Sequence, residues 1–247
     1  LYVGRFGDDE AGEFGLRSLV DEGVDVRFVE RIIGARTQIA FIVIDEVSGE
    51  RTVIWHRDKR LAYRPEEVPI SVVGEAKVLH LTPHDTEASL EMTRAARRSG
   101  TIVSIDVDNV FPGIETVLEN VDVLIASAEF PSLFLGITHA RQALIELKSR
   151  YGCGIVGVTL GVHGSLLLTE NGHFVESPGF DVPGGCQDTT GAGDAFRVGM
   201  IYGMLEGNSI EDSARSANAV AALKCRKIGA RIALPTLEEL ENFLQKM

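Results

Sequence analysis

The feature that most constrains this chain is the stretch 181–203, whose centre at 188–196 reads DTTGAGDAF. A polar turn is followed by two glycines and then by an apolar run that can continue as a helix. Thr189 and Thr190 are the candidate N-cap residues, because a hydroxyl can accept a hydrogen bond from a free amide of the first turn. A helix that starts here directs free N–H groups and the positive end of its dipole toward one point, which suits a phosphate or another anion.

Asp194 lies in the first turn of this expected helix. A carboxylate that faced a bound anion would repel it, so anion binding does not explain the residue. Beside the anion it can take a proton from an attacking hydroxyl, and the helix dipole would keep it ionised. Gly191 and Gly193 leave the backbone open to a ligand. The combination predicts phosphoryl transfer, and the alternative is an ordinary capped helix with glycines for tight packing.

The N-terminal part of the chain predicts strands before any regular alternation begins. Residues 1–4 are expected to end a strand, and residues 8–22 to form a helix that stops at Gly23. The β-branched runs 38–44 and 51–55 predict a hairpin, with Gly49 in the turn at 45–50. Two consecutive strands this early indicate a β appendage to a main sheet. Its far end carries side chains that are either solvated or in contact with a substrate or a second copy: Trp55, His56, Arg57 and Asp58.

From residue 77 onward strands and helices alternate, which indicates parallel strands with helices on both faces. The expected strands are 77–81, 101–107, 122–126 and 155–160, and the expected helices are 86–99, 129–135 and 138–150. Residues 166–169 and 173–176 predict a hairpin through Asn171-Gly172. Ligands of such sheets gather at the carboxyl ends of the strands. One rim is therefore expected from the polar strand ends 82–85, 106–109, 127–129 and 159–164.

Two more helices are expected near the C-terminus, at 208–227 and after Thr236, where TLEE is a capping box. The helix at 208–227 has a face of small residues: Ala214, Ala217, Ala221 and Ala222. This face serves either close packing against a neighbouring helix or a flat wall for an adenine ring.

DTTGAGDAF resembles, almost residue for residue, the C-terminal signature of the ribokinase/PfkB family of carbohydrate kinases. The resemblance covers nearly the whole chain and is strongest at 155–231. It implies one α/β domain over residues 1–247, with a mostly parallel sheet between two helical layers and a small β lid at about 36–60. It also implies ATP as phosphoryl donor with Mg²⁺, a small-molecule sugar as acceptor, and in many members a monovalent cation such as K⁺.

The resemblance also implies roles for individual residues. Asp194 resembles the catalytic base, and the amides of Gly191, Ala192 and Gly193 resemble the anion hole for the transferred phosphoryl group. The residues implied to approach or wall the nucleotide are Thr159, Gly161, Gly164, Ser127, Asn218, Ala222 and Gly229. Asp188 and Thr190, together with part of 224–231, resemble the loop whose backbone holds the monovalent cation.

Two further assignments concern the acceptor and Mg²⁺. Asp85 and Arg57 are candidate acceptor ligands beside Asp194, and His84 and 106–109 could read hydroxyl patterns. Glu129 could serve Mg²⁺ through water, because this ion keeps several waters and few direct protein ligands.

The chain departs from the family pattern in three places. A Gly-Gly-Asn-like segment that grips the sugar would lie upstream of Leu1, so strands are expected to precede residue 1. Many relatives carry Asn-x-x-Glu after the strand at 122–126, where this chain has Ser127-Ala-Glu129, as in some ketohexokinase-like and fructokinase-like branches. Arg197 stands where small residues are frequent, either as a surface or phosphate-side charge or with a role near the transferred phosphate.

Composition argues against several other classes. A net charge of −12 and a pI near 5.0 do not suit a nucleic-acid surface. No apolar run approaches the length of a membrane span. The three cysteines are an odd number without metal-like spacing, which fits a reduced cytoplasm. A dinucleotide-binding oxidoreductase would need a placed G-x-G-x-x-G motif, which the chain lacks.

We therefore expect ATP-dependent phosphorylation of a sugar hydroxyl, on ribose, fructose or a related small sugar. One rival is a nucleoside kinase of the same fold, which would need an aromatic clamp; the aromatic content of 6% mildly favours a sugar. A second rival is a non-catalytic binding module, against which the intact Asp194 argues. An open β lid can pair with a second copy across a two-fold axis, so a homodimer through the lid is one expected assembly.

Overall fold

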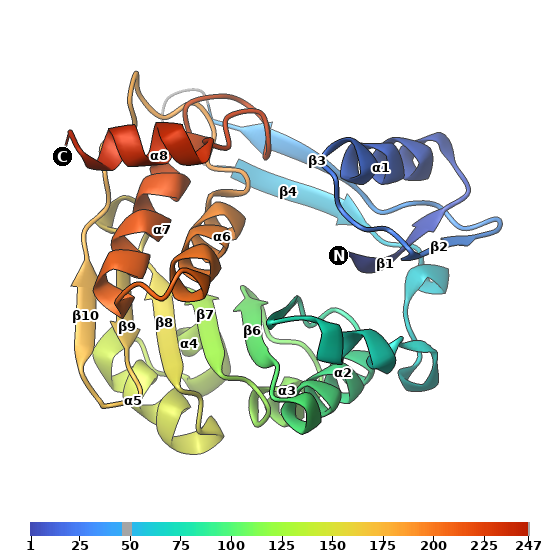
Figure 1. Ribbon diagram of the computed structural model, residues 1–247, viewed down its shortest axis with the longest axis horizontal. Coiled ribbons are helices and arrows are strands. Elements are labelled where there is room, and N and C mark those ends of the chain that lie inside the picture. Colours follow the sequence, from blue (N-terminus) through green and yellow to red (C-terminus); the bar gives the residue numbers. More distant parts are fainter. Residues whose placement is uncertain (46–50, 247) are drawn as a thin grey trace.

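The computed structural model describes residues 1–45 and 51–246. In this part of the chain the main sheet has six strands, in the order β10-β9-β8-β7-β6-β5 (Figure 1). The parallel strands are β5 (Val78–Leu81), β6 (Ile102–Val107), β7 (Val123–Ser127) and β8 (Ile155–Thr159). The antiparallel ones are β9 (Ser165–Leu168) and β10 (Phe174–Ser177). The predicted mostly parallel sheet is confirmed.

Helices cover both faces of this sheet (Figure 1). One layer consists of α2 (Thr86–Ser99), α3 (Ile114–Leu118), α4 (Phe130–Leu135) and α5 (Ala140–Tyr151). The other consists of α6 (Ala192–Leu205) and α7 (Ile210–Lys224), on which α8 (Leu237–Leu244) packs. Along β7, Leu124 and Ala126 belong to the core under the first layer, and Val123 and Ile125 to the core under the second. This alternation is typical of a strand buried on both faces and confirms the three layers.

The two long helices of the second layer approach each other closely. A Cβ added to Gly199 would lie 2.7 Å from the Cα of Ala217, and one added to Gly203 would lie 2.5 Å from the Oγ of Ser213. Ala214 and Ala217 are fully buried. At these positions the small-residue face of α7 serves close helix packing, one of the two expected uses.

The N-terminal part forms two separate two-stranded sheets. β1 (Val3–Gly7) pairs in parallel with β2 (Phe28–Ile32) across the helix α1 (Glu10–Asp21). β3 (Ile39–Ile44) and β4 (Arg51–His56) pair antiparallel, on the side of the main sheet toward which β6 and β7 point (Figure 1). This hairpin is the one predicted to act as a lid, and it is called the lid below. Residues 46–50 of the expected turn, with Gly49, lie outside the described residues.

The expected hairpin of β3 and β4 is present, and within the described residues neither strand pairs with the main sheet. Several details differ from the sequence-based expectation. The first strand is Val3–Gly7 instead of 1–4. β2 reads FVERI, with two charged residues that hide a strand pattern, and α3 is only five residues long. Short 3₁₀ helices at Lys59–Leu61, Pro65–Glu67 and Ile70–Glu75 connect the lid to β5, and another at Gly161–His163 follows β8.

The capping box that was predicted at Thr236 and Glu239 opens α8. In the described ranges, no helix is both long enough and apolar enough to cross a membrane.

Two glycines near β9 and β10 give a matched test of this fold. Gly164 has φ +89° and ψ −124°, and an added Cβ would lie 2.1 Å from the carbonyl oxygen of Ser177. Gly172 has φ +78°, but an added Cβ would meet nothing within 4 Å. We expect Gly164→Ala to lower the free energy of unfolding by roughly 3 kcal/mol or more and Gly172→Ala by about 1 kcal/mol, as measured by urea unfolding. Equal losses would contradict the close approach at Gly164.

Candidate active site

The turn before α6 is built around the buried carboxylate of Asp188. Its Oδ1 accepts a hydrogen bond from the amide of Thr190, and its Oδ2 accepts one from the amide of Gly229, both at 2.7 Å. Burial alone would raise the pKa of this carboxyl, but these hydrogen bonds, together with the hydroxyl of Thr190 and the charge of Lys224, outweigh it and lower the pKa. Asp188 therefore stays ionised and joins the turn to the segment after α7.

The predicted N-cap residues of α6 are wrong. The N-cap is Gly191, with φ +77°, and it has no side chain to cap the helix. The amide of Thr190 is held by Asp188, and the hydroxyl of Thr189 accepts from Nη1 of Arg51 at 2.9 Å. A left-handed turn at this place needs glycine, because other residues are strained there.

The first turn of α6 presents backbone amides beside Asp194. The first amides of any α-helix have no partner within the helix, and its dipole adds positive charge at that end. The amide of Ala192 already donates to the carbonyl of Thr189 at 3.0 Å, so of the three expected anion-hole amides it is the one engaged within the turn. The side chain of Asp194 is exposed at the same turn. This arrangement can bind an anion and accept a proton next to it.

Arg197 is not a surface charge. It is only 4% exposed, and its Nη2 lies 2.5 Å from Oδ1 of Asp106 at the end of β6. The same Nη2 donates to the carbonyl of Ile125 in β7 at 3.2 Å. A Cβ on Gly193 would lie 2.5 Å from Nη1 of Arg197. The guanidinium therefore underlies the first turn of α6, and Gly193 has no side chain because Arg197 fills that space.

Asp106 has an unusual electrostatic setting. Burial raises the pKa of its carboxyl to about 7, with the charges of Asp194 and Asp108 acting in the same direction and that of Arg197 opposing them. The pKa of His80 on β5 is lowered by burial and by Arg197, while Asp194 opposes this. The charges of Arg197 and Asp194, both in α6, therefore affect the pKa values of groups on two strands of the sheet, β5 and β6.

The residues predicted near the nucleotide phosphates meet at a cavity of about 630 Å³ at the ends of β7 and β8. Its lining contains Ser127, Glu129, Thr159 and Gly161, and also His163, which lies in the expected rim segment 159–164 but had no predicted role of its own. Gly161 has φ +58° and open space around it. The expected rim at these two strand ends is therefore present.

The other predicted nucleotide residues are engaged inside the protein. The side-chain Nδ2 of Asn218 donates to Oγ of Ser165 and to both Oγ and the carbonyl of Ser177, at 3.0–3.1 Å. Ala222 is buried, Gly164 packs against Ser177, and Gly229 donates its amide to Asp188. Asn218 ties α7 to β9 and β10.

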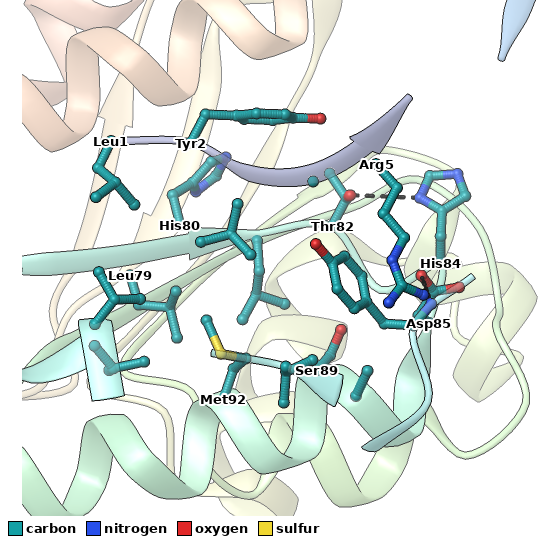
Figure 2. A pocket seen from close by; sticks show the side chains of 18 of the residues that line it. Leu1, Tyr2, Arg5, Leu79, His80, Thr82, His84, Asp85, Ser89 and Met92 are labelled. Atoms are coloured by element: carbon teal, nitrogen blue, oxygen red, sulfur yellow. Dashed lines mark hydrogen bonds between the residues drawn. The ribbon is translucent and has the colours of Figure 1, made fainter. Parts of the chain in front are cut away.

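A larger cavity of about 1070 Å³ lies between β1, β5 and α2 (Figure 2). Both predicted acceptor ligands line it, but they bind each other: Nη1 and Nη2 of Arg57 donate to Oδ1 and Oδ2 of Asp85, each at 2.6 Å. No residue of 191–194 lines this cavity. His80 also lines it, and its side chain lies 3.1 Å (Nδ1 to Oγ) from that of Ser104 in β6.

An aromatic contact joins the lid to the sheet, and the sequence analysis did not predict it. The ring of Trp55 in β4 lies 5.9 Å from that of His84, which follows β5, and His84 lies 5.1 Å from Phe111, which follows β6. The sequence did predict polar strand ends at 82–85 and 106–109. It did not predict that the lid lies over them, so the contact with Trp55 was not foreseen.

The comparisons with known proteins settle the family. The model of the pfkB family carbohydrate kinases matches residues 1–237. The chain belongs to this family. It is a carbohydrate kinase with the ribokinase fold.

Three similar proteins illustrate the range of kinases that this chain resembles. An ATP-dependent ribose-1-phosphate kinase of Halopiger xanaduensis is 30% identical, over 99% of this chain and 80% of its own. An aminoimidazole riboside kinase of Salmonella typhimurium is 31% identical, over 98% of this chain and 81% of the relative. A fructokinase structure with bound ATP from Xylella fastidiosa is 25% identical with a TM-score of 0.83. The match covers 99% of this chain and 84% of the fructokinase chain.

The carbohydrate kinase offers few direct ligands for a divalent cation. Within the described ranges, no group of three or more His, Cys, Asp or Glu side chains could hold a metal ion together. Mg²⁺ is commonly bound through one or two carboxylates, several waters and the substrate phosphates. Glu129 at the smaller cavity fits such a site, so its role toward Mg²⁺ stays a prediction.

The raised pKa of Asp106 predicts a pH-dependent stability. Between the ordinary Asp pKa and about 7, the folded protein holds a proton that the unfolded chain has released, so this group destabilises the fold increasingly as pH rises through that window. We expect the free energy of unfolding of the wild type, relative to Asp106→Asn, to fall by about 1 kcal/mol per unit from pH 5 to 7. Urea unfolding across this range measures it. A pH-independent difference would contradict the assignment.

Proposed function

We propose that this kinase transfers the γ-phosphoryl group of ATP to a hydroxyl of a small sugar, with ribose, fructose or a related compound as the acceptor class. The observation that carries the proposal is the exposed carboxylate of Asp194 in the first turn of α6, beside helix-end amides. A catalytic base next to an anion site is what phosphoryl transfer to an alcohol requires.

In the proposed reaction, Asp194 accepts the proton of the acceptor hydroxyl. The acceptor oxygen forms a bond to the γ-phosphorus as the bond between that phosphorus and the β–γ bridging oxygen breaks, and ADP leaves. The amides of Gly191 and Gly193, with that of Ala192 where it is released from Thr189, stabilise the negative charge on the transferring group. Arg197 supports this turn from below and contributes positive charge there.

The smaller cavity suits the phosphate side of ATP. Ser127 and Thr159 supply hydroxyls, Gly161 leaves its backbone accessible, and Glu129, which lines the same cavity, would serve Mg²⁺ through water. The ATP dependence of the ribose-1-phosphate kinase relative supports ATP as donor. Asn218 and Gly229 are hydrogen-bonded inside the protein and Gly164 packs against Ser177, so at the nucleotide we expect these three residues to shape its wall.

The acceptor belongs between the lid and the carboxyl ends of β5 and β6. Lid closure would exclude water, which competes as an acceptor. Asp85 and Arg57 face this region as an ion pair. The sugar would therefore meet hydrogen-bonding groups that are already paired with each other, instead of two isolated charges.

A second candidate acceptor is a nucleoside or another N-riboside. Trp55, His84 and Phe111 form an aromatic set between the lid and the sheet, and flat rings stack on such faces. The relative from Salmonella typhimurium is named for an aminoimidazole riboside, which supports keeping this option.

The cysteines support our proposal of a cytoplasmic location. All three lie within the described ranges and none forms a disulfide; Cys153 and Cys225 are buried, and Cys186 is exposed. An exposed thiol is typical of a reducing compartment.

The base assignment predicts a specific loss. We expect Asp194→Ala to lower kcat by roughly a thousandfold while ATP binding persists, because general base catalysis contributes that order of rate. The matched control is Glu211→Ala, which removes an exposed carboxylate from the first turn of the neighbouring helix α7. ADP release and calorimetric ATP binding measure both properties. Undiminished turnover in Asp194→Ala would rule out this mechanism.

The acceptor class is decided by ADP release against a panel of sugars, sugar phosphates and nucleosides. Turnover with a sugar supports the first candidate and turnover with a nucleoside the second. ATP binding without turnover on any acceptor would favour a non-catalytic module.

The lid predicts a homodimer, which we propose as the assembly. Ile39, Phe41, Val43 and Ile54 share the outer face of β3–β4 and are 51–69% exposed. A second copy of this face would cover them across a two-fold axis. We expect Phe41→Asp to convert a dimer into a monomer in sedimentation velocity, whereas Phe14→Asp, an exposed change on α1, leaves the dimer intact. A wild-type monomer would contradict the proposal.

A further inference from the structure

Lys224 is a fully buried lysine at the end of α7. It is 0% exposed, and its Nζ donates to the carbonyl oxygen of Asp188 at 2.7 Å. Lysine is almost never fully buried without a partner. The C-terminal end of a helix also favours a positive charge. The ammonium therefore has a favourable site inside the protein, directly under the turn that leads to α6.

The same loop supplies the other contacts of that site. The carboxylate of Asp188 is held by the amides of Thr190 and Gly229, and the charge of Lys224 contributes to the lowered pKa of that carboxyl. The amide of Gln187 donates to the carbonyl of Cys225 at 2.9 Å. The segment 187–190 is thus bound to the end of α7 by backbone hydrogen bonds and by one ammonium.

The residues around Asp188 do not fit a monovalent metal ion as well as they fit this ammonium. Such an ion would need the backbone and carboxylate oxygens of the same loop. The carbonyl of Asp188 is already bound to Nζ of Lys224, and both of its carboxylate oxygens accept amides. A second cation at these oxygens would be repelled by the ammonium.

We propose that the ammonium of Lys224 is the resident cation of the Asp188 loop, so that this kinase needs no monovalent metal ion such as K⁺. Lys224 is then a positioning residue for the anion-hole turn. Asp188 precedes Gly191 by three residues, and a Cβ on Gly191 would lie 3.1 Å from both the Cβ and the carbonyl oxygen of Ala230, in the segment that follows Lys224. The kinetic consequences of this proposal rest on the proposed function, whereas its prediction about cation binding does not.

The first experiment uses the full wild-type chain. ADP release and thermal unfolding are measured in potassium, ammonium, sodium and tetramethylammonium chloride at equal ionic strength. We expect turnover to vary by less than about twofold and no saturable, ion-specific rise in Tm, since an ion that bound only the folded state would raise it. A saturable response to K⁺ in either measurement overturns the proposal.

The second experiment changes the ammonium. Lys224→Ala should lower kcat by about 10-fold to 100-fold with little change in the KM for the acceptor, because it displaces the anion-hole amides. Added ammonium or K⁺ should then restore turnover, since the space is left for a small cation. Lys224→Met fills that space with an uncharged chain and should not respond to either ion.

Lys148 provides the control for a lysine that only holds backbone. Its Nζ donates to the carbonyls of Cys153 and Gly154 at 2.9 and 2.8 Å, after α5 on the other face of the sheet. Lys148→Ala should lose thermal stability without any cation-dependent turnover. Full turnover of Lys224→Ala in every salt, or a loss that no cation restores, overturns the proposal.

Failure of the cation proposal can be distinguished from misfolding of the variant and from failure of the proposed function. If Lys224→Ala does not fold, the wild-type ion series still decides whether a metal ion binds. If the wild type shows no kinase activity on any acceptor, the proposed function fails, and the thermal series alone decides the cation question.

Discussion

The buried carboxylate of Asp188 holds together the two segments that make the candidate active site. It accepts the amide of Thr190 before α6 and the amide of Gly229 after α7, each at 2.7 Å. Hydrogen bonds to a charged group typically contribute about 1.5–3 kcal/mol each, so removing this carboxylate would free both segments. The left-handed turn at Gly191 and the start of α6 depend on that connection, because no side chain caps the helix.

Local positive charge compensates the overall acidity of the protein. The chain carries a net charge of −12, yet the proposed reaction would bring a polyanionic nucleotide to Asp194. Arg197 and Lys224 lie buried beneath the same turn, one paired with Asp106 and the other bound to the carbonyl of Asp188. Both add to the helix dipole without offering an exposed side chain. The site can therefore attract phosphate through fixed, buried charges while the surface stays acidic.

The sequence was sufficient for the main elements and for the position of Asp194. Alternating apolar runs predicted the parallel strands, and the DTTGAGDAF string predicted the glycine-rich start of α6. It could not show that Arg197 is buried, because that depends on Asp106, ninety-one residues earlier. The N-cap was misassigned for two reasons: the hydroxyl of Thr189 accepts from Arg51, 138 residues away, and the amide of Thr190 donates to Asp188, two residues earlier. Long-range partners decide what Arg197 and Thr189 do, whereas a local turn holds Thr190.

The lid is anchored at its base and exposed along its strands. Arg57, just after β4, forms a partly buried two-point ion pair with Asp85, which is stronger than an exposed single contact. Arg51, at the other end of β4, reaches the hydroxyl of Thr189 through one exposed hydrogen bond. The second contact is the weaker one, because a single exposed hydrogen bond contributes less than a partly buried two-point ion pair. The hairpin is therefore held more firmly at its Arg57 end, next to β5, than at its Arg51 end, next to the turn before α6.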